Sequence, residues 1–411
     1  LFIPFIEKGI QILKNENYLS FIIPNKVLTA NYGTALRNLI NKNYSIDEIY
    51  DLSKDNVFSV DVYPVILFIS KTPQSSILKI SKIEEGKAET FKINFKYEEN
   101  WALYLNLNYN LYSKIIANKN TFDNNKIFTL YNAATVSEAY EIKEFIEDKD
   151  TANINQLKLI NSGTIDPYLS LWGFKPITYI KERYSNPIIN IENIKDKEWT
   201  KKPKIAIAGM ALRIEAFLDI EGTYLPLKST TVITANNKEN LKYICAIINS
   251  KLLSFLFRIA NSANTMAGGY LNVNKTNLND LPIIYNNTVD IRAFSSLVEQ
   301  ILSLNKDLQE TSSKFQRTLN RKFEILENLP KKLENWYELT FADFIKELKK
   351  KKIELIYEEE VKLEDYFLPE QKKALEIKAK INQTDKEIDT MVYKLYDLTN
   401  KEIAIIENES K

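Results

Sequence analysis

The chain has 411 residues, of which 45% are hydrophobic and 27% are charged, and its formal net charge is +1. This length predicts two or three domains, and the near-neutral charge means that any nucleic-acid binding must come from an uneven distribution of basic residues. The absence of histidine and the single cysteine exclude histidine-based catalysis, histidine-ligated zinc and an internal disulfide framework.

Several targeting and cofactor motifs are missing from the sequence. Neither of the common phosphate-binding loops, GxGxxG and GxxxxGK[ST], occurs. No apolar run reaches the ~18 residues that a membrane span requires, and the opening LFIPFIEKGI lacks the basic flank and cleavage site of a signal peptide. Together with the lone Cys245, these features predict a cytoplasmic protein.

The first 75 residues alternate between helical and strand patterns. Apolar residues at helical spacing predict helices over 2–13 and 31–41, and compact apolar runs predict strands over 18–23 and 46–52. After a polar loop, residues 62–69 form a nearly uninterrupted apolar run, which is typical of a strand buried on both faces of an α/β sheet. We therefore predict an α/β fold for this part of the chain.

The rest of the chain changes character twice more. Residues 76–126 are polar and predict a connector with short strands and one helix. Residues 127–285 are rich in strand patterns and include an amphipathic helix over 240–260. Residues 286–411 carry apolar side chains at helical spacing among many charges, which predicts long amphipathic helices paired antiparallel.

Six segments stand out, in this order along the chain: FIEKGIQILKNENYLSFIIPNKVL, VFSVDVYPVILFISK, NAATVSEAYEIKEFI, INSGTIDPYLSLWG, YICAIINSKLLSFLF…GGYLNVNKTNLNDLPI and DKEIDTMVYKLYDLTNKEIAII. They resemble the adenine-N6 DNA methyltransferases of the TaqI type. This family includes the methyltransferase-plus-specificity half of single-chain type IIG restriction-modification enzymes. The first two are similar to the end of that family's catalytic domain. The next three are similar to its target-recognition domain, and the last is similar to its C-terminal helical signature.

The resemblance implies a fold for each region. Residues 1–75 would form a truncated Rossmann-like methyltransferase half-sheet, and residues 76–126 a connector. Residues 127–285 would form a mixed α/β target-recognition (specificity) domain, and residues 286–411 a helical C-terminal region with long amphipathic helices.

The chain departs from the family's pattern in one large respect. The NPPY-type catalytic tetrapeptide and the glycine-containing cofactor motif are absent, and in the family they precede the segment that begins here at Leu1. We therefore expect no catalytic residue in this chain. The resemblance places the missing methyltransferase portion, and any endonuclease portion, upstream of Leu1.

Two aromatic residues match base- and cofactor-binding positions of the family. Methylation of adenine N6 requires the base outside the duplex, and an aromatic face offsets part of the lost stacking. The resemblance assigns that stacking role to Phe58, and the alternative is a core phenylalanine that caps the sheet. It likewise implies that Phe5 packs against the adenine ring of S-adenosylmethionine. The alternative is that Phe5 is a core residue of its helix. We expect the intact parent to use this cofactor and the fragment to bind it weakly or not at all.

The target-recognition domain is expected to contact double-stranded DNA through basic and amide side chains. Arginine pairs well with guanine, and asparagine with adenine, in the major groove. Arg213 is the first choice for a base contact. The other candidates lie before strands, between strands or near the Gly268-Gly269 turn, and each could instead be an ordinary surface residue: Lys201, Lys202, Lys204, Lys228, Asn264, Asn274 and Lys275. We expect no metal site.

The sequence thus favours DNA recognition and target-adenine binding within an adenine-N6 DNA methyltransferase of a restriction-modification system. One alternative is a non-catalytic specificity module that positions separate methyltransferase or nuclease subunits. The other is a coiled-coil interaction scaffold that rests on residues 292–411.

Overall fold

The computed structural model describes residues 2–55, 57–58, 63–72, 75–96, 100–117, 120–195, 197–262, 269–323 and 331–409. The chain divides into two compact units. The first unit comprises residues 1–119 and 255–269, and the second comprises residues 120–254 and 270–411.

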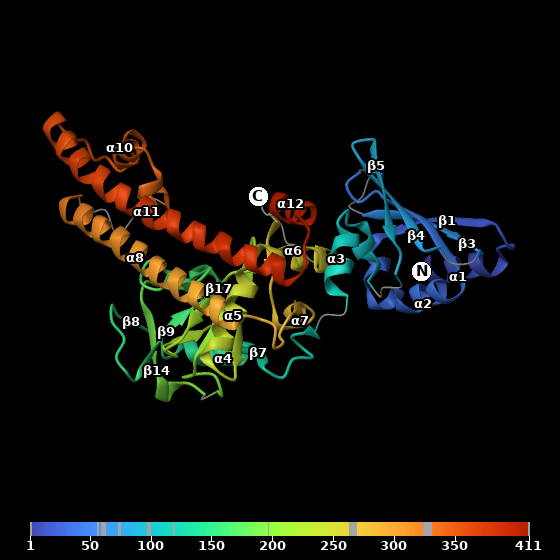
Figure 1. Ribbon diagram of the computed structural model, residues 1–411, viewed down its shortest axis with the longest axis horizontal. Coiled ribbons are helices and arrows are strands. Elements are labelled where there is room, and N and C mark those ends of the chain that lie inside the picture. Colours follow the sequence, from blue (N-terminus) through green and yellow to red (C-terminus); the bar gives the residue numbers. More distant parts are fainter. Residues whose placement is uncertain are drawn as a thin grey trace. The chain divides into compact units, whose positions relative to one another are not determined.

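The first unit contains a five-stranded sheet in the order β1-β3-β2-β4-β5 (Figure 1). Its strands are β1 (Tyr18–Pro24), β2 (Ser45–Asp51), β3 (Pro64–Ser70), β4 (Ile77–Glu84) and β5 (Lys87–Asn94). β3 lies between β1 and β2 and is antiparallel to both, whereas β2 and β4 are parallel. β3 is an interior strand: Val65, Leu67 and Ile69 on one face are fully buried, and the apolar side chains between them on the other face are half-buried.

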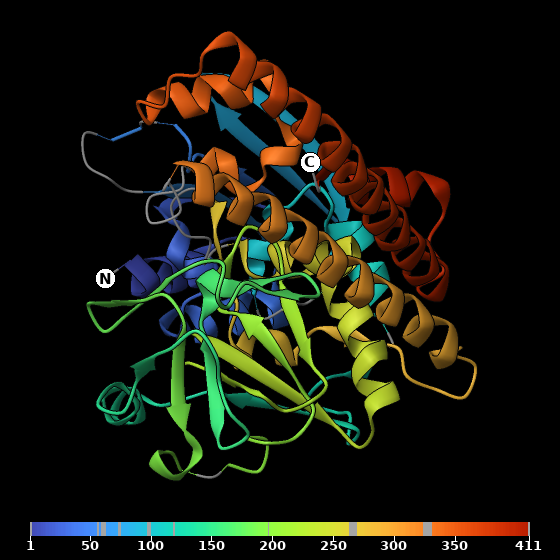
Figure 2. The same cartoon turned by 90° about the vertical axis from the view of Figure 1, so that its left-hand side faces the viewer.

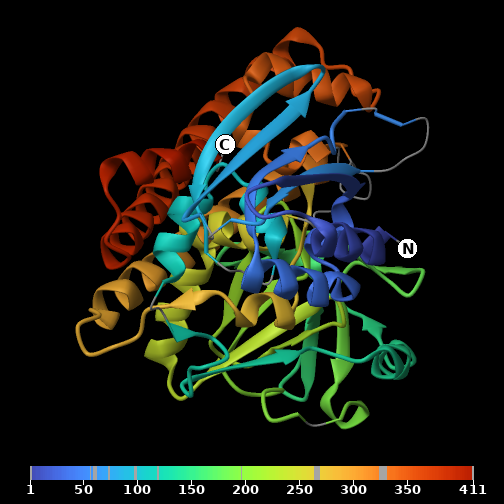
Figure 3. The ribbon, with the colours of Figure 1, turned by 90° about the vertical axis from the view of Figure 1, so that its right-hand side faces the viewer.

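Residues 76–126, predicted as a connector, contribute two strands to this sheet. β4 pairs with both β2 and β5, and the side chains of Leu78 and Ile80 are fully buried. Lys79 between these two residues, and Lys82 and Glu84 further along β4, obscured the alternation. Figure 3 shows the two light-blue strands of the β4–β5 hairpin beside the darker strands of the sheet.

Helices accompany the first sheet: α1 (Phe2–Ile12), η1 (Asn25–Leu28), η2 (Asn31–Gly33), α2 (Thr34–Asn43), η3 (Trp101–Leu105) and α3 (Tyr109–Ile116). α1 buries Ile6 and Ile10, one turn apart, as its apolar spacing requires. Arg37 of α2 is also buried, and its guanidinium donates to the carbonyls of Val27 (2.7 Å) and Ala30 (3.0 Å). These bonds fix the turn that follows β1.

The second unit contains two four-stranded sheets. One has the order β18-β9-β14-β8 and the other β17-β15-β19-β7. The strands of the first are β8 (Glu147–Asp148), β9 (Gln156–Ile160), β14 (Pro187–Asn190) and β18 (Tyr224–Pro226). Those of the second are β7 (Phe128–Asn132), β15 (Lys204–Ala208), β17 (Ala216–Asp219) and β19 (Thr230–Ala235).

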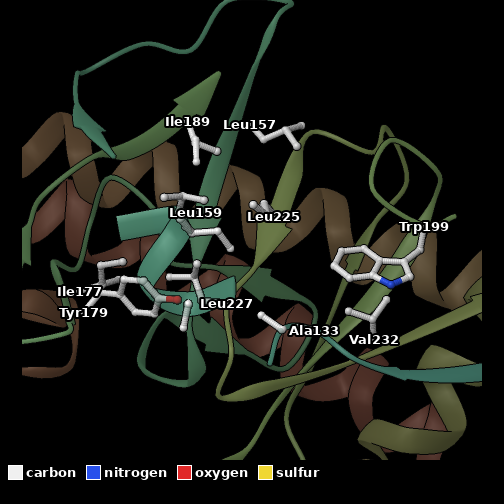
Figure 4. Close-up of a cluster of buried hydrophobic side chains, with 13 residues drawn as sticks. Ala133, Leu157, Leu159, Ile177, Tyr179, Ile189, Trp199, Leu225, Leu227 and Val232 are labelled. Atoms are coloured by element: carbon white, nitrogen blue, oxygen red, sulfur yellow. The ribbon is translucent and has the colours of Figure 1, made fainter. Parts of the chain in front are cut away.

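A shared hydrophobic core joins these two sheets. Leu157 and Leu159 of β9 and Val232 of β19 belong to one buried cluster, which also contains Trp199 (Figure 4). Short elements complete this part: β6 (Asn120–Thr121), α4 (Val136–Lys143), η4 (Ser162–Thr164), β10 (Ile165–Asp166), β11 (Leu169–Ser170), β12 (Ile177–Tyr179), β13 (Glu182–Tyr184), η5 (Ile191–Asn193), β16 (Met210–Ala211), β20 (Leu271–Asn272), α7 (Lys275–Asn279) and β21 (Pro282–Ile283).

The helix predicted over 240–260 is two helices, α5 (Lys238–Asn249) and α6 (Lys251–Ala260). Ser250 has an extended backbone, and its hydroxyl accepts a hydrogen bond from the Leu253 N–H (3.3 Å). The Lys251 N–H donates to Asp389 Oδ1 (3.0 Å), and the Lys251 ammonium lies 2.7 Å from Glu407 Oε2. The break is therefore stabilised from a distant part of the chain.

The C-terminal region is helical, as predicted. It contains α8 (Ile291–Phe323), α9 (Lys331–Glu334), η9 (Trp336–Glu338), α10 (Phe341–Lys350), α11 (Tyr357–Leu395) and α12 (Asn400–Glu409). Lys322 forms an ion pair with Glu359 (3.4 Å), and the Tyr366 hydroxyl donates to Thr318 Oγ1 (3.4 Å). Because the earlier residue of α8 meets the later residue of α11, the two helices pack antiparallel. Gln309 of α8 donates to the Ser170 carbonyl (3.1 Å), and Figure 2 shows the helix pair above the strands of this unit.

Candidate nucleic-acid interface

The carboxyl ends of β1 and β2 meet the start of β3 at one edge of the first sheet. The Asn25 N–H donates to the Tyr63 carbonyl (2.7 Å), and the Leu52 N–H donates to the Pro64 carbonyl (3.0 Å). The Asn25 amide also donates to Ser53 Oγ (3.3 Å). Since β1 and β2 both run antiparallel to β3, they point the same way, and open α/β sheets bind ligands at the carboxyl ends of such strands.

Phe58 lies in the loop that follows β2 at this edge. Its side chain is 48% exposed, so it is not the buried cap of the sheet that one interpretation of the sequence required. Val57 beside it is 43% exposed, and its N–H donates to the Asp55 carbonyl (2.9 Å). One face of an aromatic ring is therefore accessible to a partner at this position.

Phe5 lies near the amino end of α1, which the fold brings to the same edge. The ring of Phe2 contacts that of Tyr32, with centroids 6.2 Å apart, and Tyr32 follows the carboxyl end of β1. The Phe5 side chain is 63% exposed, whereas Ile6 and Ile10 form the buried face of the helix. Phe5 is thus not a core residue of this unit, and its cofactor role stays a prediction.

Lys204 cannot contact DNA, which corrects one of the predicted phosphate contacts. Its side chain is fully buried, and the ammonium lies 2.9 Å from Asp219 Oδ2 and 3.1 Å from the Thr200 carbonyl. Burial lowers the pKa of Lys204, and the Asp219 carboxylate opposes that shift. Lys204 is therefore a structural residue that joins the start of β15 to the end of β17.

Lys201 and Lys202 are exposed and precede β15. Gly222, in a left-handed conformation with φ 68°, packs so closely on this turn that an added Cβ would lie 2.2 Å from the Lys201 carbonyl oxygen. The Lys202 ammonium lies 3.9 Å from Glu198 Oε1. These two lysines lie at the amino end of β15, so they are separated by the length of that strand from the other predicted contacts.

Two other predicted contacts, Lys228 and Lys275, belong to a region beyond the carboxyl end of β15 that we call the β16 corner. It consists of Ser162, Gly209, Met210, Lys228, Ser229, Asn272 and Lys275. The Gly209 N–H donates to Ser162 Oγ (2.9 Å), and Ser162 Oγ donates to the Ser229 carbonyl (2.7 Å). A Cβ on Gly209 would lie 2.1 Å from the Ser229 carbonyl oxygen, so only glycine fits there.

Arg213 follows the β16 corner but is half-buried and faces carboxyl groups. Asp166, Glu215 and Asp385 all interact electrostatically with it. The pKa of Glu215 is raised to about 7, chiefly by burial and also by neighbouring Asp166, while Arg213 and Lys175 oppose the shift. The guanidinium is thus partly neutralised within the protein, which weakens the case for Arg213 as the leading base contact.

We expect Glu215→Gln to stabilise the protein at pH 8 and to change its stability little at pH 5. The folded-state pKa of about 7 lies above the ordinary value of 4.5, so the native state binds the extra proton between these values. The stability that this proton contributes is full below about pH 4.5 and is lost as pH rises through about 7. Thermal unfolding midpoints at both pH values measure the difference, and the exposed Glu221→Gln is the control. Equal shifts at both pH values would contradict the prediction.

Of the remaining candidates, Asn274 has a structural role. Its side-chain oxygen accepts from the Asn277 N–H (3.0 Å), which caps α7. Lys275 is half-buried and Lys228 is exposed, both in the β16 corner. Asn264 lies outside the described residues. Asn272, two positions before Asn274, was missed, and the signal that could have identified it is its place in a short strand that alternates buried and exposed residues.

Among the described residues, no group of three or more histidine, cysteine, aspartate or glutamate side chains is arranged to hold a metal ion. No single helix in the described ranges is long and apolar enough to cross a membrane. α5 and α6 pass that test only as a bent pair, and α5 is almost wholly buried.

Comparison with known families matches three regions of the chain. Residues 1–58 match the Eco57I restriction-modification methylase, residues 173–283 match the TaqI-like C-terminal specificity domain, and residues 288–392 match a domain of unknown function, DUF8810. The resemblance to methyltransferases of restriction-modification systems is therefore confirmed. The specificity-domain match contains most of the β16 corner.

Individual relatives agree with these matches. A protein of Methanocaldococcus jannaschii, named as a type II restriction enzyme and methyltransferase, is 24% identical over 77% of this chain and 27% of its own length. The Escherichia coli type II restriction enzyme and methyltransferase Eco57I is 32% identical over 16% of this chain and 7% of its own length. The chain thus spans about a quarter of the first relative and less of the second. The solved structure of the type IIL restriction-modification enzyme MmeI in complex with DNA aligns with 98% of this chain and 50% of its own, at 13% identity and a TM-score of 0.42.

Proposed function

We propose that this chain supplies double-stranded DNA recognition and target-adenine binding for an adenine-N6 DNA methyltransferase of a restriction-modification system. The observation that carries the proposal is the order of the matched regions: a methylase segment over 1–58 followed by a specificity domain over 173–283. Each region presents a surface suited to its task. The first sheet offers an exposed aromatic at its carboxyl edge, and the second unit offers the exposed Lys228 and Asn272 at the β16 corner.

The first sheet would be half of a larger Rossmann-like methyltransferase sheet. β1 is an edge strand among the described strands, and Tyr18 on it is 68% exposed. Phe5 and Ile12 of α1 are 63% and 70% exposed. An open sheet edge has unpaired backbone groups that suit pairing with another part of a protein. The preceding methyltransferase portion of the intact parent is the partner that we propose for this surface.

In the intact parent, Phe58 would stack on the extruded adenine and hold its exocyclic amine in place. S-adenosylmethionine, when bound, supplies the methyl group that this amine accepts. The residues here fit that cofactor only in part, because Phe5 provides an exposed aromatic face but the glycine-containing motif is absent from the chain. The catalytic tetrapeptide would come from the preceding portion, and we expect this chain alone to be inactive.

The C-terminal helices support the second unit. α8 bonds to β11 through Gln309 and Ser170, and α11 reaches the start of α6 through Asp389. These contacts favour a buttress for the specificity domain over an independent coiled-coil scaffold.

A selection of DNA duplexes tests the proposal. The full chain is incubated with a pool of duplexes that carry a randomised segment, and the bound duplexes are sequenced. We expect one short consensus, and we expect affinity for it to fall steeply as salt rises because phosphate contacts release counterions. Failure to bind duplex DNA, or binding without a sequence preference, would overturn the proposal. Specific binding by a chain that never supports methylation when joined to its preceding portion would favour a non-catalytic specificity module.

A further inference from the structure

The β16–β20 ribbon presents one apolar and one amide side chain next to each other. Met210 of β16 and Asn272 of β20 are directly opposite in an antiparallel pair. The Val273 N–H donates to the Gly209 carbonyl (2.9 Å), which makes the adjacent Met210–Asn272 pair the non-hydrogen-bonded kind, in which opposite side chains lie closest. Both side chains therefore project from the same face of the ribbon.

That face points to solvent, whereas the other face is buried. Met210 is 48% exposed and Asn272 is exposed, but Ala211 and Leu271 between them are 4% and 2% exposed. The exposed face therefore offers an apolar side chain beside an amide, and both are accessible to a partner. The alternation fixes which two side chains a partner would meet.

The Asn272 carboxamide makes no hydrogen bond within the part of the chain that the structure describes. The Asn272 backbone carbonyl accepts a hydrogen bond from the Asn277 side-chain amide (3.1 Å). Asn274, by contrast, uses its side chain to cap α7. An exposed amide with both a donor and an acceptor available suits recognition of a complementary pair of groups. Asn272 is therefore better placed than Asn274 to contact a base.

The ribbon is held rigidly at the β16 corner. The Ser162 hydroxyl bonds both the Gly209 N–H and the Ser229 carbonyl. Gly209 packs against the Ser229 carbonyl with no room for a side chain. Exposed Lys228 adjoins Ser229, and Lys275 follows Asn272 by three residues. A fixed ribbon with flanking lysines is complementary to the phosphates that border a DNA groove.

We propose that the β16–β20 ribbon enters the DNA major groove and reads an A·T base pair, with Asn272 bonding adenine and Met210 contacting the thymine methyl group. The major groove admits a two-stranded ribbon. There adenine offers the N7 acceptor and the N6 donor, which a carboxamide matches with two hydrogen bonds, and thymine offers its 5-methyl group to an apolar side chain. The inference rests on the proposed function, and it deepens that function by naming the base pair and the two residues that read it.

The test measures binding of the full chain to the consensus duplex from the selection and to two altered duplexes. Each altered duplex differs from the consensus by one group or one atom of a base. Replacing thymine by deoxyuridine removes only the methyl group, and replacing adenine by 7-deazaadenine removes only the N7 acceptor. Met210→Ala should weaken binding of the thymine duplex roughly 4- to 15-fold, the value of one or two buried carbon groups, and should not change binding of the deoxyuridine duplex. Asn272→Ala should lose about 5- to 150-fold on adenine and distinctly less on 7-deazaadenine, which keeps only the N6 bond.

Ile154→Ala is the matched control, since Ile154 is an apolar side chain of the same unit that is 92% exposed. Equal losses on the normal and altered duplexes would overturn the inference and leave sequence-specific binding intact. A consensus without an A·T pair would also overturn it. Absence of any sequence preference in the unaltered chain would instead overturn the proposed function, so the two failures are distinguishable. Unchanged urea midpoints of the variants show that their folding is intact.

Discussion

Asp219→Asn is expected to lower the free energy of unfolding of the second unit by about 3–5 kcal/mol, the typical cost of breaking a buried ion pair. The substitution leaves the Lys204 ammonium fully buried and without its counter-ion. The Asp219 carboxylate also accepts the N–H groups of Thr223 (3.1 Å) and Tyr224 (3.0 Å), so the loop after β17 loses charge-assisted bonds as well. Urea unfolding followed by tryptophan fluorescence measures the loss.

Two further variants separate the buried pair from a general effect of charge. Lys202→Met removes an exposed lysine whose nearest carboxylate oxygen is 3.9 Å away, and it should cost less than about 1 kcal/mol. The double variant Lys204→Met, Asp219→Asn should recover much of the stability lost by Asp219→Asn alone, because it removes the unpaired charge. If Asp219→Asn cost no more than Lys202→Met, the structural role of Lys204 would be wrong.

Phe58→Ala in the full-length parent is expected to reduce methylation about 5- to 150-fold, the range that corresponds to one base–aromatic stacking contact. Binding of the unmethylated duplex should change much less, because most of the affinity comes from phosphate and groove contacts. Single-turnover methylation and equilibrium binding are measured on the same duplex. Phe58→Trp should retain activity, since it preserves an aromatic face.

The control for Phe58 is Phe145→Ala, which removes a comparably exposed phenylalanine (44% against 48%) from the second unit. Unchanged turnover in Phe58→Ala would remove this residue from the base-binding site. Equal losses of binding and methylation would indicate that Phe58 contributes to folding or docking of the loop.

Sequence patterns predicted the first sheet well where burial is continuous and poorly where it alternates. β3 was predicted within two residues because one of its faces is buried and the other is at least half-buried. β4 was assigned to a connector because Lys79 separates its buried residues Leu78 and Ile80 within a polar stretch. The single helix predicted over 240–260 is divided at Ser250, and Asp389, 138 residues away from Lys251, caps the second half. No local pattern contains that contact.

The candidate DNA contacts show the same limit. Lys201, Lys202 and Lys204 look alike as a basic run, and only the pairing of β15 with β17 shows that Lys204 faces Asp219 in the interior. Asn274 was predicted because it lies near a glycine pair, and the helix cap that occupies its side chain depends on backbone geometry. Residue type selects candidate side chains, whereas the three-dimensional register decides which of them is available to a partner.

The ratio of two dissociation constants tests the central claim most directly. The full chain is titrated at one fixed salt concentration with the consensus duplex from the selection and with a shuffled duplex of the same length and composition. We predict binding to the consensus about 1,000-fold or more tighter than to the shuffled duplex, as is typical of sequence-specific DNA-binding proteins. Equal affinities for the two duplexes would contradict the account, because electrostatic attraction alone does not distinguish one sequence from the other.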